Sequence, residues 1–354
     1  MKSCLITNSG INQNTGGGIV SLNLLQALEQ CTDVKYIFSN KKYEGKPSYS
    51  INPADYNYNA DPFSMDYLAY HLLPDEPIDI VQTYGCPFGL TVEELKRKGA
   101  KVVADVAPHN LEISQEEHLK LTGKYPYPHL TEEMLWGMYS RNLCLSDVVI
   151  VHSHSSAKYI QQKARLKELP TVIPHGINLP ETIPAYPEKF IPGYFGALGV
   201  DKGLSYLIRA WVQINTPTPK GELYVGGYGT EAFGQSPYCK ALGGFENTSD
   251  FYKQVSIGVF PSVTEGFNIC ALEMMAHGRP VIVAEGAGVN ELIEDGKSGF
   301  RIPIRNIEAL QGRINYFFDN PSEVTRMGAE ARKMAEKYEW SKVREQYVSI
   351  YNQL

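Results

Sequence analysis

The sequence has 354 residues, of which 43 % are hydrophobic and 20 % charged, so it is long enough for two globular domains and is biased neither toward disorder nor toward a fibrous repeat. Its net charge of -6 gives no general attraction to polyanions, and we therefore expect no nucleic-acid partner. The six cysteines are scattered and do not cluster with histidines, which argues against a disulfide framework or a metal site and fits reduced thiols in the cytoplasm. No apolar run approaches the roughly 18 residues of a membrane span, so any membrane contact would be peripheral.

Short apolar runs rich in β-branched residues alternate with helical patterns along the chain, as in parallel sheets covered by helices on both faces. In the first half we predict strands at residues 3–7, 34–38, 78–82, 101–106, 148–151 and 171–173, and helices that begin near residues 19, 90, 131 and 153. In the second half we predict strands at residues 194–196, 222–225, 257–260 and 280–283, and helices that begin near residues 204, 249, 268, 288 and 307.

A proline-rich stretch over residues 174–192 separates the two halves and is typical of a linker. We therefore predict an N-terminal domain over residues 1–180, a C-terminal domain over residues 181–335, and a helix over residues 336–354 that crosses back to the first domain. Residues 43–63 are crowded with Tyr, Asn and Pro and have no clear period. They are predicted to form a surface loop, and contact with an acceptor is an alternative.

The first predicted strand is followed by a polar loop that closes in three glycines at residues 16–18, just before an amphipathic helix. Glycines at a helix start let the backbone approach a ligand, and the free N–H groups there favour anionic oxygens. A glycine turn that serves only the path of the backbone would have a similar sequence. A dinucleotide-binding dehydrogenase is disfavoured, because the glycines are contiguous and residues 36–40 contain no acid to bind a ribose.

In the second half, charged residues follow two of the predicted strands. Lys202 follows a strand and stands beside a helix start, where it is either a surface lysine or a cation for a departing diphosphate. Glu265 lies in the loop after the strand at residues 257–260, and Glu273 lies inside the helix that begins near Asn268. Because side chains lean toward a helix N-terminus, both carboxylates are expected to face one crevice together with the N–H groups of Phe267, Asn268 and Ile269.

With these residues in place, the chain resembles the retaining GT-B glycosyltransferases of family four, also described as glycosyl transferases group 1. The resemblance is strongest over residues 193–303 and thinner elsewhere. The motifs that carry it are Glu265-Gly266-Phe267, Glu273, Gly278-Arg279-Pro280-Val281, Gly288, Glu291 and Asp295-Gly296-Lys297-Ser298-Gly299-Phe300, with weaker matches at Lys202-Gly203, Gly226-Gly227-Tyr228-Gly229, residues 173–177, Gly17-Gly18 and Pro108-His109-Asn110. It implies an α/β GT-B fold, in which two Rossmann-like domains with parallel sheets face each other across a cleft.

The resemblance also implies roles for individual residues. Glu273 would hold the ribose of a nucleotide diphosphate sugar, Glu265 the donor sugar, and Lys202 the diphosphate. Gly17 and Gly18 would approach the phosphates from the N-terminal domain, and His109 would lie close to the transferred sugar. Gly266, Phe267, Asn268 and Ile269 would complete the donor site, whereas Glu291 is better explained as a structural acid.

Two positions depart from the family's pattern. Ala197 stands where an arginine is usual, so one of two expected diphosphate cations is missing, and Asn268 stands where a glycine commonly ends the Glu-Gly-Phe-Gly run. Asn268 adds a side chain at the sugar site, which can alter the choice of donor.

The expected activity is that of a retaining hexosyltransferase in which the acceptor hydroxyl attacks from the face that the diphosphate leaves, with neither a metal ion nor a cofactor. The acceptor would be a glycan, a lipid-linked molecule or a small hydroxyl compound. A non-catalytic sugar-nucleotide or glycan-binding protein with the same fold is the main alternative. A nucleotide-sugar epimerase would need more acid/base groups than the sequence places near Glu265.

Overall fold

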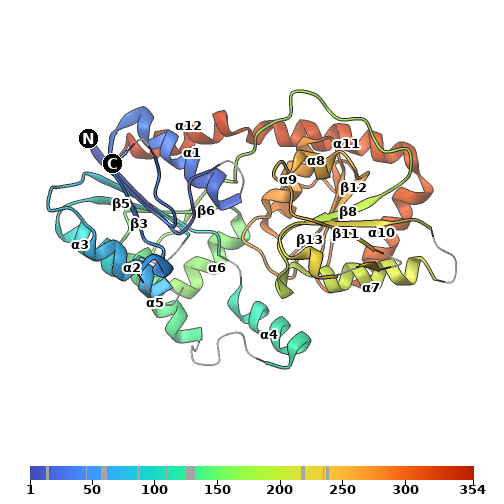
Figure 1. Cartoon of the computed structure of the whole chain (residues 1–354), viewed down its shortest axis with the longest axis horizontal. Helices are drawn as coiled ribbons and strands as arrows, with labels where there is room; N and C mark the ends of the chain where they lie inside the picture. The colour runs from blue at the N-terminus through green and yellow to red at the C-terminus, as the bar shows by residue number, and fades with distance from the viewer. Residues whose placement is uncertain are drawn as a thin grey trace. The chain divides into compact units, whose positions relative to one another are not determined.

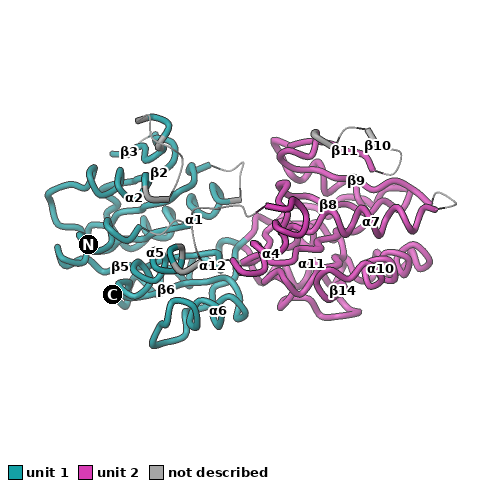
Figure 2. Tube along the Cα trace, turned by 90° about the horizontal axis from the view of Figure 1, so that it is seen from below, with its two compact units in different colours: residues 1–108, 129–176, 340–354 teal, residues 109–128, 177–339 magenta. Residues whose placement is uncertain are grey.

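The computed structural model describes residues 1–12, 16–44, 46–56, 62–85, 88–108, 110–124, 132–216, 220–233, 235–236 and 239–354. The chain divides into two compact units (Figure 2). Unit 1 consists of residues 1–108, 129–176 and 340–354, and unit 2 consists of residues 109–128 and 177–339.

Unit 1 is built on a seven-stranded parallel sheet with the strand order β3-β2-β1-β4-β5-β6-β7. Its strands are β1 (Lys2–Thr7), β2 (Asp33–Ser39), β3 (Ser48–Ser50), β4 (Ile80–Tyr84), β5 (Lys101–Asp105), β6 (Val148–Val151) and β7 (Thr171–Val172). The strand order changes direction between β1 and β4, as in Rossmann-type sheets. Most strand residues are buried, which explains why they read as continuous apolar runs.

Helices cover both faces of this sheet (Figure 1). The first face carries α1 (Gly16–Cys31) and α12 (Trp340–Tyr351), and the second carries α2 (Pro62–His71), α3 (Gly89–Arg97), α5 (Glu132–Leu145) and α6 (His154–Ala164). The α3 helix begins where Asp66, on α2, accepts hydrogen bonds from the N–H groups of Leu90 at 2.8 Å and Thr91 at 3.0 Å. A carboxylate at this position satisfies N–H groups that have no partner within the helix.

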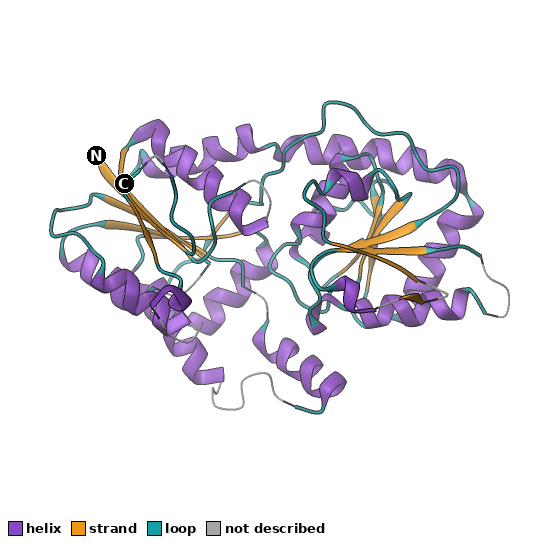
Figure 3. Cartoon of the chain, viewed as in Figure 1, coloured by secondary structure: helices purple, strands orange, loops and turns teal. Residues whose placement is uncertain are grey.

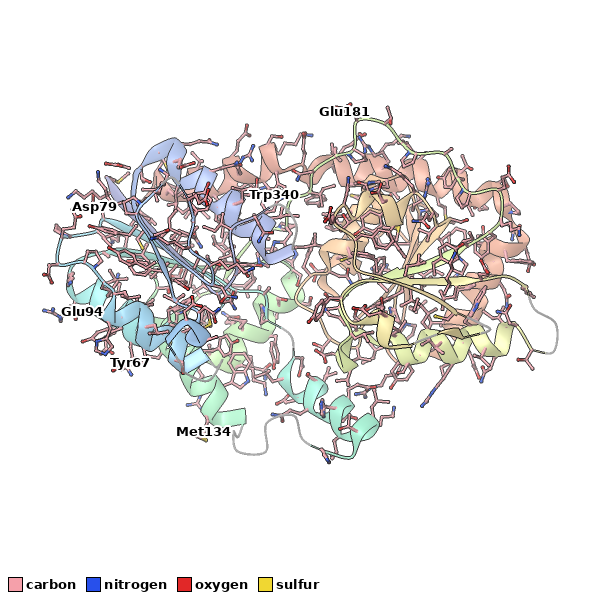
Figure 4. All side chains as sticks on the ribbon, in the orientation of Figure 1. Tyr67, Asp79, Glu94, Met134, Glu181 and Trp340 are labelled. Atoms are coloured by element: carbon pink, nitrogen blue, oxygen red, sulfur yellow. The ribbon has the colours of Figure 1, made fainter. Side chains whose placement is uncertain are left out.

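The C-terminal helix α12 is anchored in unit 1 by buried hydrogen bonds. It begins at Trp340, which is labelled in Figure 4. The Tyr347 hydroxyl donates to Asp105 at 2.6 Å, and the Tyr351 hydroxyl donates to Gln82 at 2.7 Å. Both acceptors belong to central strands of the sheet, so the end of the chain forms part of the unit 1 core.

Unit 2 repeats this architecture with one antiparallel edge strand, in the order β10-β11-β9-β8-β12-β13-β14. Among the strand pairs of the described residues in this sheet, only that of β10 and β11 is antiparallel. The strands are β8 (Pro192–Phe195), β9 (Leu223–Gly226), β10 (Gln235–Ser236), β11 (Cys239–Gly243), β12 (Ile257–Phe260), β13 (Val281–Ala284) and β14 (Gly299–Ile302). Here the order changes direction between β8 and β12, and the loops after these two strands carry the charged residues described below.

The helices of unit 2 also lie on both faces of its sheet (Figure 3). One face carries α8 (Ser249–Tyr252), α9 (Ile269–Ala276) and α11 (Pro321–Ala335), and the other carries α7 (Leu204–Ile214) and α10 (Ile307–Asp319). A short 3-10 helix, η2 (Val200–Lys202), precedes α7, and another, η4 (Gly288–Leu292), follows β13. The core is correspondingly split, with Trp211 and Phe317 on the α7 and α10 side and Phe251 and Met274 on the α9 side.

All ten strands predicted from the sequence are present, and four further strands, β3, β10, β11 and β14, were missed. β3 falls inside residues 43–63, which were predicted to be a loop; Ser48 pairs with Ile37 of β2 there. Residue 45 and residues 57–61 of this segment lie outside the described residues. The helix predicted from residue 288 is the short 3-10 helix η4.

One segment folds with a different unit from the one that its sequence position indicated. The helix α4 (Leu111–Thr122) lies between β5 and β6 in the chain, within the predicted N-terminal domain, but it belongs to unit 2. The physical reason is a buried carboxylate, Glu117, whose hydrogen-bond donors are Tyr206 and Arg305 of unit 2. The described part of the chain contains no helix that is both long and apolar enough to cross a membrane.

Candidate active site

The loop between β12 and α9, residues 261–268, is held by backbone hydrogen bonds to the loop that follows β13. The Glu265 N–H donates to the Gly286 carbonyl at 2.8 Å, and the Glu265 carbonyl accepts from the Gly288 N–H at 3.1 Å. The Phe267 carbonyl accepts from the Val289 N–H at 2.7 Å. Because β12 and β13 are parallel neighbours, these loops meet at the carboxyl edge of the sheet, where open α/β sheets bind ligands.

The Glu265 carboxylate is held by three side chains. One oxygen is ion-paired with the Lys202 ammonium group. The other accepts hydrogen bonds from the Ser262 hydroxyl at 2.9 Å and from the Asn268 amide at 2.8 Å. The side chains of Lys202 and Glu265 are 29 % and 16 % exposed, so the pair is reached by solvent but largely enclosed.

The charge of Lys202 is secured by this pairing. Burial lowers the pKa of Lys202, but the attraction of Glu265 and the hydrogen bond to it outweigh burial and raise that pKa above its ordinary value. Lys202 therefore remains a cation at every physiological pH. It is thus suited to stabilising negative charge on a phosphate.

Lys202 is placed by a glycine that allows two loops to touch. Gly203 has a φ of 69°, in the left-handed region, and a Cβ added there would overlap the Pro261 carbonyl oxygen. The Val263 N–H also donates to the Asp201 carbonyl at 2.8 Å. The loop after β8 and the loop after β12 are thereby locked together, which explains why Lys202 reaches Glu265.

Asn268 has two functions in this arrangement. Its side-chain oxygen accepts from the Ala271 N–H at 3.0 Å and so caps α9, while its amide nitrogen donates to Glu265. Its φ of 86° lies in the left-handed region, which glycine adopts without strain and asparagine tolerates. The side chain of Asn268 therefore points at Glu265 and at the helix start.

Glu273 lies on α9 and has a different environment. It accepts a hydrogen bond of 2.5 Å from the hydroxyl of Tyr252, at the end of α8. Burial raises the pKa of Glu273 to about 6, while the Tyr252 hydroxyl acts in the opposite direction. His277, one turn later, is bonded through its ring to the Glu273 carbonyl and the Ser249 hydroxyl, and burial lowers its pKa to about 4, so it is neutral at pH 7.

The two glutamates act on a common neighbour, Cys270. Burial raises the pKa of the Cys270 thiol most strongly, and the negative charges of Glu273 and Glu265 raise it further, whereas Lys202 lowers it. Lys202 and Glu265 therefore meet directly before α9, and Glu273 lies in the second turn of that helix. The structure brings together the second-half residues that the sequence singled out for chemistry.

The remaining predicted positions are placed as follows. Phe267 is a buried core side chain, and Ile269 is partly buried against the same cluster. In unit 1, Gly17 and Gly18 lie in the first turn of α1, and a Cβ on Gly17 would overlap the Ser9 hydroxyl. This packing explains Gly17 without a ligand, and a phosphate-binding role for Gly17 and Gly18 stays a prediction. His109 lies outside the described residues.

Arg279, from the sequence motif at residues 278–281, has a structural role. Its guanidinium group is completely buried and donates to the backbone carbonyls of Tyr252 at 3.3 Å, Pro184 at 3.0 Å and Ala185 at 2.7 Å. It therefore fixes Tyr252, the residue that bonds Glu273, and ties down the segment that leads into β8.

Sequence reasoning missed Tyr252, Ser262 and Cys270. Ser262 lies three residues before Glu265, a spacing from which contact could have been anticipated. Tyr252 lies 21 positions from Glu273 on another helix, and only the fold brings the two together. Within the described residues, no group of three or more His, Cys, Asp or Glu side chains is arranged to hold a metal ion.

Comparison with known proteins finds a family similarity for this region. Residues 189–320 match the family described as Glycosyl transferases group 1. The match spans β8 to α10 and so includes Lys202, Glu265 and Glu273.

A curated relative of this chain is an uncharacterized glycosyltransferase of Haemophilus influenzae, 26 % identical over 58 % of this chain and 61 % of the relative. The chain spans about three fifths or less of the length of the first curated relatives that it matches. Sucrose-phosphate synthase from Thermosynechococcus elongatus superimposes with a TM-score of 0.79 at 19 % identity, over 99 % of this chain and 98 % of that one. Anabaena HepE in complex with UDP-glucose superimposes with a TM-score of 0.74 at 16 % identity, over 99 % of this chain and 100 % of that one. The predicted GT-B fold, with two parallel-sheet α/β domains, is confirmed.

Proposed function

We propose that this chain is a group 1 glycosyltransferase, a retaining hexosyltransferase of family four that moves a sugar from a nucleotide diphosphate sugar to a hydroxyl acceptor without a metal ion or cofactor. The observation that carries the proposal is the ion pair of Lys202 with Glu265 just before α9, at the carboxyl edge of the unit 2 sheet, with Glu273 in the second turn of the same helix. These residues lie inside the region that matches the family.

Each of these residues suits a different part of the donor. The ammonium group of Lys202 is suited to the charge that develops on a departing diphosphate. Glu265, fixed by Ser262 and Asn268, is a preorganised acceptor for hydroxyls of the sugar. Glu273, held by Tyr252, is suited to a ribose diol. HepE, a structural neighbour, is described in complex with UDP-glucose, which supports a nucleotide diphosphate sugar as the donor.

In the proposed mechanism, the acceptor hydroxyl attacks from the side that the diphosphate leaves, and the departing phosphate takes the acceptor proton. The chain's own residues orient the donor and balance charge, with negative charge at Glu265 beside the sugar and positive charge at Lys202 beside the phosphates. As the sequence resemblance implies, we propose that Gly17 and Gly18 approach the phosphates and that His109 lies near the transferred sugar. We further propose a cytoplasmic protein whose acceptor is a glycan, a lipid-linked molecule or a small hydroxyl compound.

A thermal-shift panel of nucleotide diphosphate sugars tests donor binding first, since a ligand at 100 times its Kd stabilises by about 2.7 kcal/mol. A stabilising donor is then incubated with an acceptor panel, with and without EDTA, and the anomeric configuration of the product is read by NMR. Retention with full activity in EDTA is expected. Donor binding without transfer or hydrolysis would instead support a sugar-nucleotide or glycan-binding protein, and an inverted product would contradict the proposed mechanism.

A further inference from the structure

Helix α4 is the one described element that lies between strands of the unit 1 sheet in the chain and yet folds with unit 2 (Figure 2). Its start is well defined, because the Asn110 side chain accepts from the Ile113 N–H at 3.1 Å. It ends at Thr122 and is capped by Gly123, which has a φ of 71° in the left-handed region. Such caps make α4 a discrete helix.

The attachment of α4 to unit 2 is centred on a charged side chain. Glu117 is completely buried, and its two oxygens accept from the Tyr206 hydroxyl and from the Arg305 Nε, each at 2.8 Å. Lys120 donates to the same Tyr206 hydroxyl at 3.0 Å. A buried carboxylate is tolerated only when it is paired and hydrogen-bonded, so this position of α4 depends on these donors.

The backbone of Arg305 is also adapted to this contact. Its φ of 60° lies in the left-handed region, which is unfavourable for a side chain such as arginine. Residues held in such conformations persist only where the surrounding structure determines them. The hydrogen bond to Glu117 and the ion pair with Glu116 are the interactions that this conformation directs toward α4.

The other contacts of α4 reach the two loops that carry the candidate site. The Asn110 N–H donates to the Thr264 hydroxyl at 2.6 Å, and Thr264 immediately precedes Glu265. At the other end of α4, Leu121 lines a pocket together with Gly199 and Val200, which lie in the loop that carries Lys202. α4 therefore touches the Lys202 loop and the Glu265 loop at once.

We propose that Glu117 is a positioning residue, which fastens α4 to unit 2 and so holds residues 110–122 as a fixed wall beside Lys202 and Glu265. This role rests on the proposed transferase function. Lys202, Glu265 and Glu273 do not depend on Glu117 for their own contacts. Loss of Glu117 is therefore expected to leave donor affinity intact while displacing the wall against which the reacting groups are aligned. A displacement of about 1 Å near reacting groups can cost roughly a hundredfold in rate.

The chain offers a matched pair of variants for the test. Glu117→Gln removes the buried charge with little change of shape, whereas Glu116→Gln removes the neighbouring, 62 % exposed carboxylate that pairs with the same Arg305. Tyr206→Phe, which removes one donor to Glu117, is a milder second variant in case Glu117→Gln folds poorly. In Glu117→Gln we expect amide exchange of residues 111–122 to accelerate about tenfold or more and kcat to fall about 10- to 100-fold, with UDP affinity within twofold of wild type. Tyr206→Phe should change amide exchange and kcat in the same directions as Glu117→Gln but by less. Glu116→Gln should match wild type.

Each outcome decides a separate point. Unchanged exchange of α4 in both Glu117→Gln and Tyr206→Phe would overturn the attachment. Faster exchange with unchanged kcat would overturn the positioning role, as would a parallel loss of UDP affinity. If the wild-type protein transfers no sugar to any acceptor, the proposed function and the positioning role both fail, while the exchange measurement still decides whether Glu117 holds α4.

Discussion

The buried carboxylate of Glu273 is predicted to lower the stability of unit 2 when it is ionised. The variant Glu273→Gln measures this loss of stability. Burial raises the pKa of Glu273 from 4.5 to about 6, so the folded state disfavours the ionised form. The full effect, at a pH well above 6, corresponds to about 2 kcal/mol. Glutamine has nearly the same shape and never ionises, so the variant avoids this cost.

The sign of the pH dependence follows from the raised pKa. The folded state binds the proton more tightly than the unfolded chain, so this contribution to stability is present at low pH and is lost as pH rises from 4.5 through about 6. Glu273→Gln is therefore expected to be more stable than wild type by about 0.8 kcal/mol at pH 5 and by about 2 kcal/mol at pH 8.

The assay is urea unfolding of both proteins at pH 5 and pH 8, followed by tryptophan fluorescence, since Trp211 lies in the unit 2 core. Glu285→Gln, at an exposed position in the loop after β13, is the control and should show no such dependence. A stability difference that is equal at the two pH values, or a variant less stable than wild type at pH 8, would refute the reasoning.

A second variant, Glu273→Ala, tests donor binding. Loss of the carboxylate should weaken donor binding by roughly 1.5 to 3 kcal/mol, and unchanged affinity by titration would remove Glu273 from the site.

Three further variants test other parts of the structure. Lys202→Ala should lower turnover by about a hundredfold to a thousandfold in a transfer assay, because it removes a stabiliser of developing charge, and wild-type turnover would contradict this assignment. Arg279→Ala should destabilise unit 2 by about 3 kcal/mol, since it leaves buried carbonyls unpaired; a urea midpoint close to wild type would count against that role. Tyr347→Phe should destabilise unit 1 by about 1.5 to 3 kcal/mol, measured by urea unfolding, because buried Asp105 loses a hydrogen-bond donor, and a neutral effect would show that α12 is held otherwise.

The sheets could be predicted from the sequence because their strands are buried on both faces. β12 and β13 read as short runs of apolar residues, and the structure places both completely in the core. The missed strands have weaker signals: β11 carries an exposed lysine and ends in glycine, and β14 has an arginine in its centre. These strands form through pairing with neighbours already in the sheet, which a local pattern does not report.

The candidate site was partly predictable for a similar reason. The positions of Lys202, Glu265 and Glu273 after strands of a parallel sheet placed them at one edge, and in the structure Lys202 pairs with Glu265 while Glu273 lies on the helix that follows. The direct ion pair of Lys202 with Glu265 was not anticipated. It depends on the close approach that Gly203 allows to Pro261, a contact between loops almost 60 positions apart in the chain.

Helix α4 shows a more general reason why sequence patterns can fail to place a segment. Assignment of a segment to a domain rests on its apolar face, since apolar burial normally drives packing. In α4 the completely buried residue is Glu117, while the apolar Leu119 is exposed, so the buried side of the helix is centred on a charged residue. The partners of Glu117 lie 89 and 188 positions away, on α7 and after β14. A polar attachment of this kind is a weak source of stability but a specific one, because few other surfaces of the molecule can satisfy a buried carboxylate. A specific attachment of this kind is required if α4 is to hold one defined position beside Lys202 and Glu265.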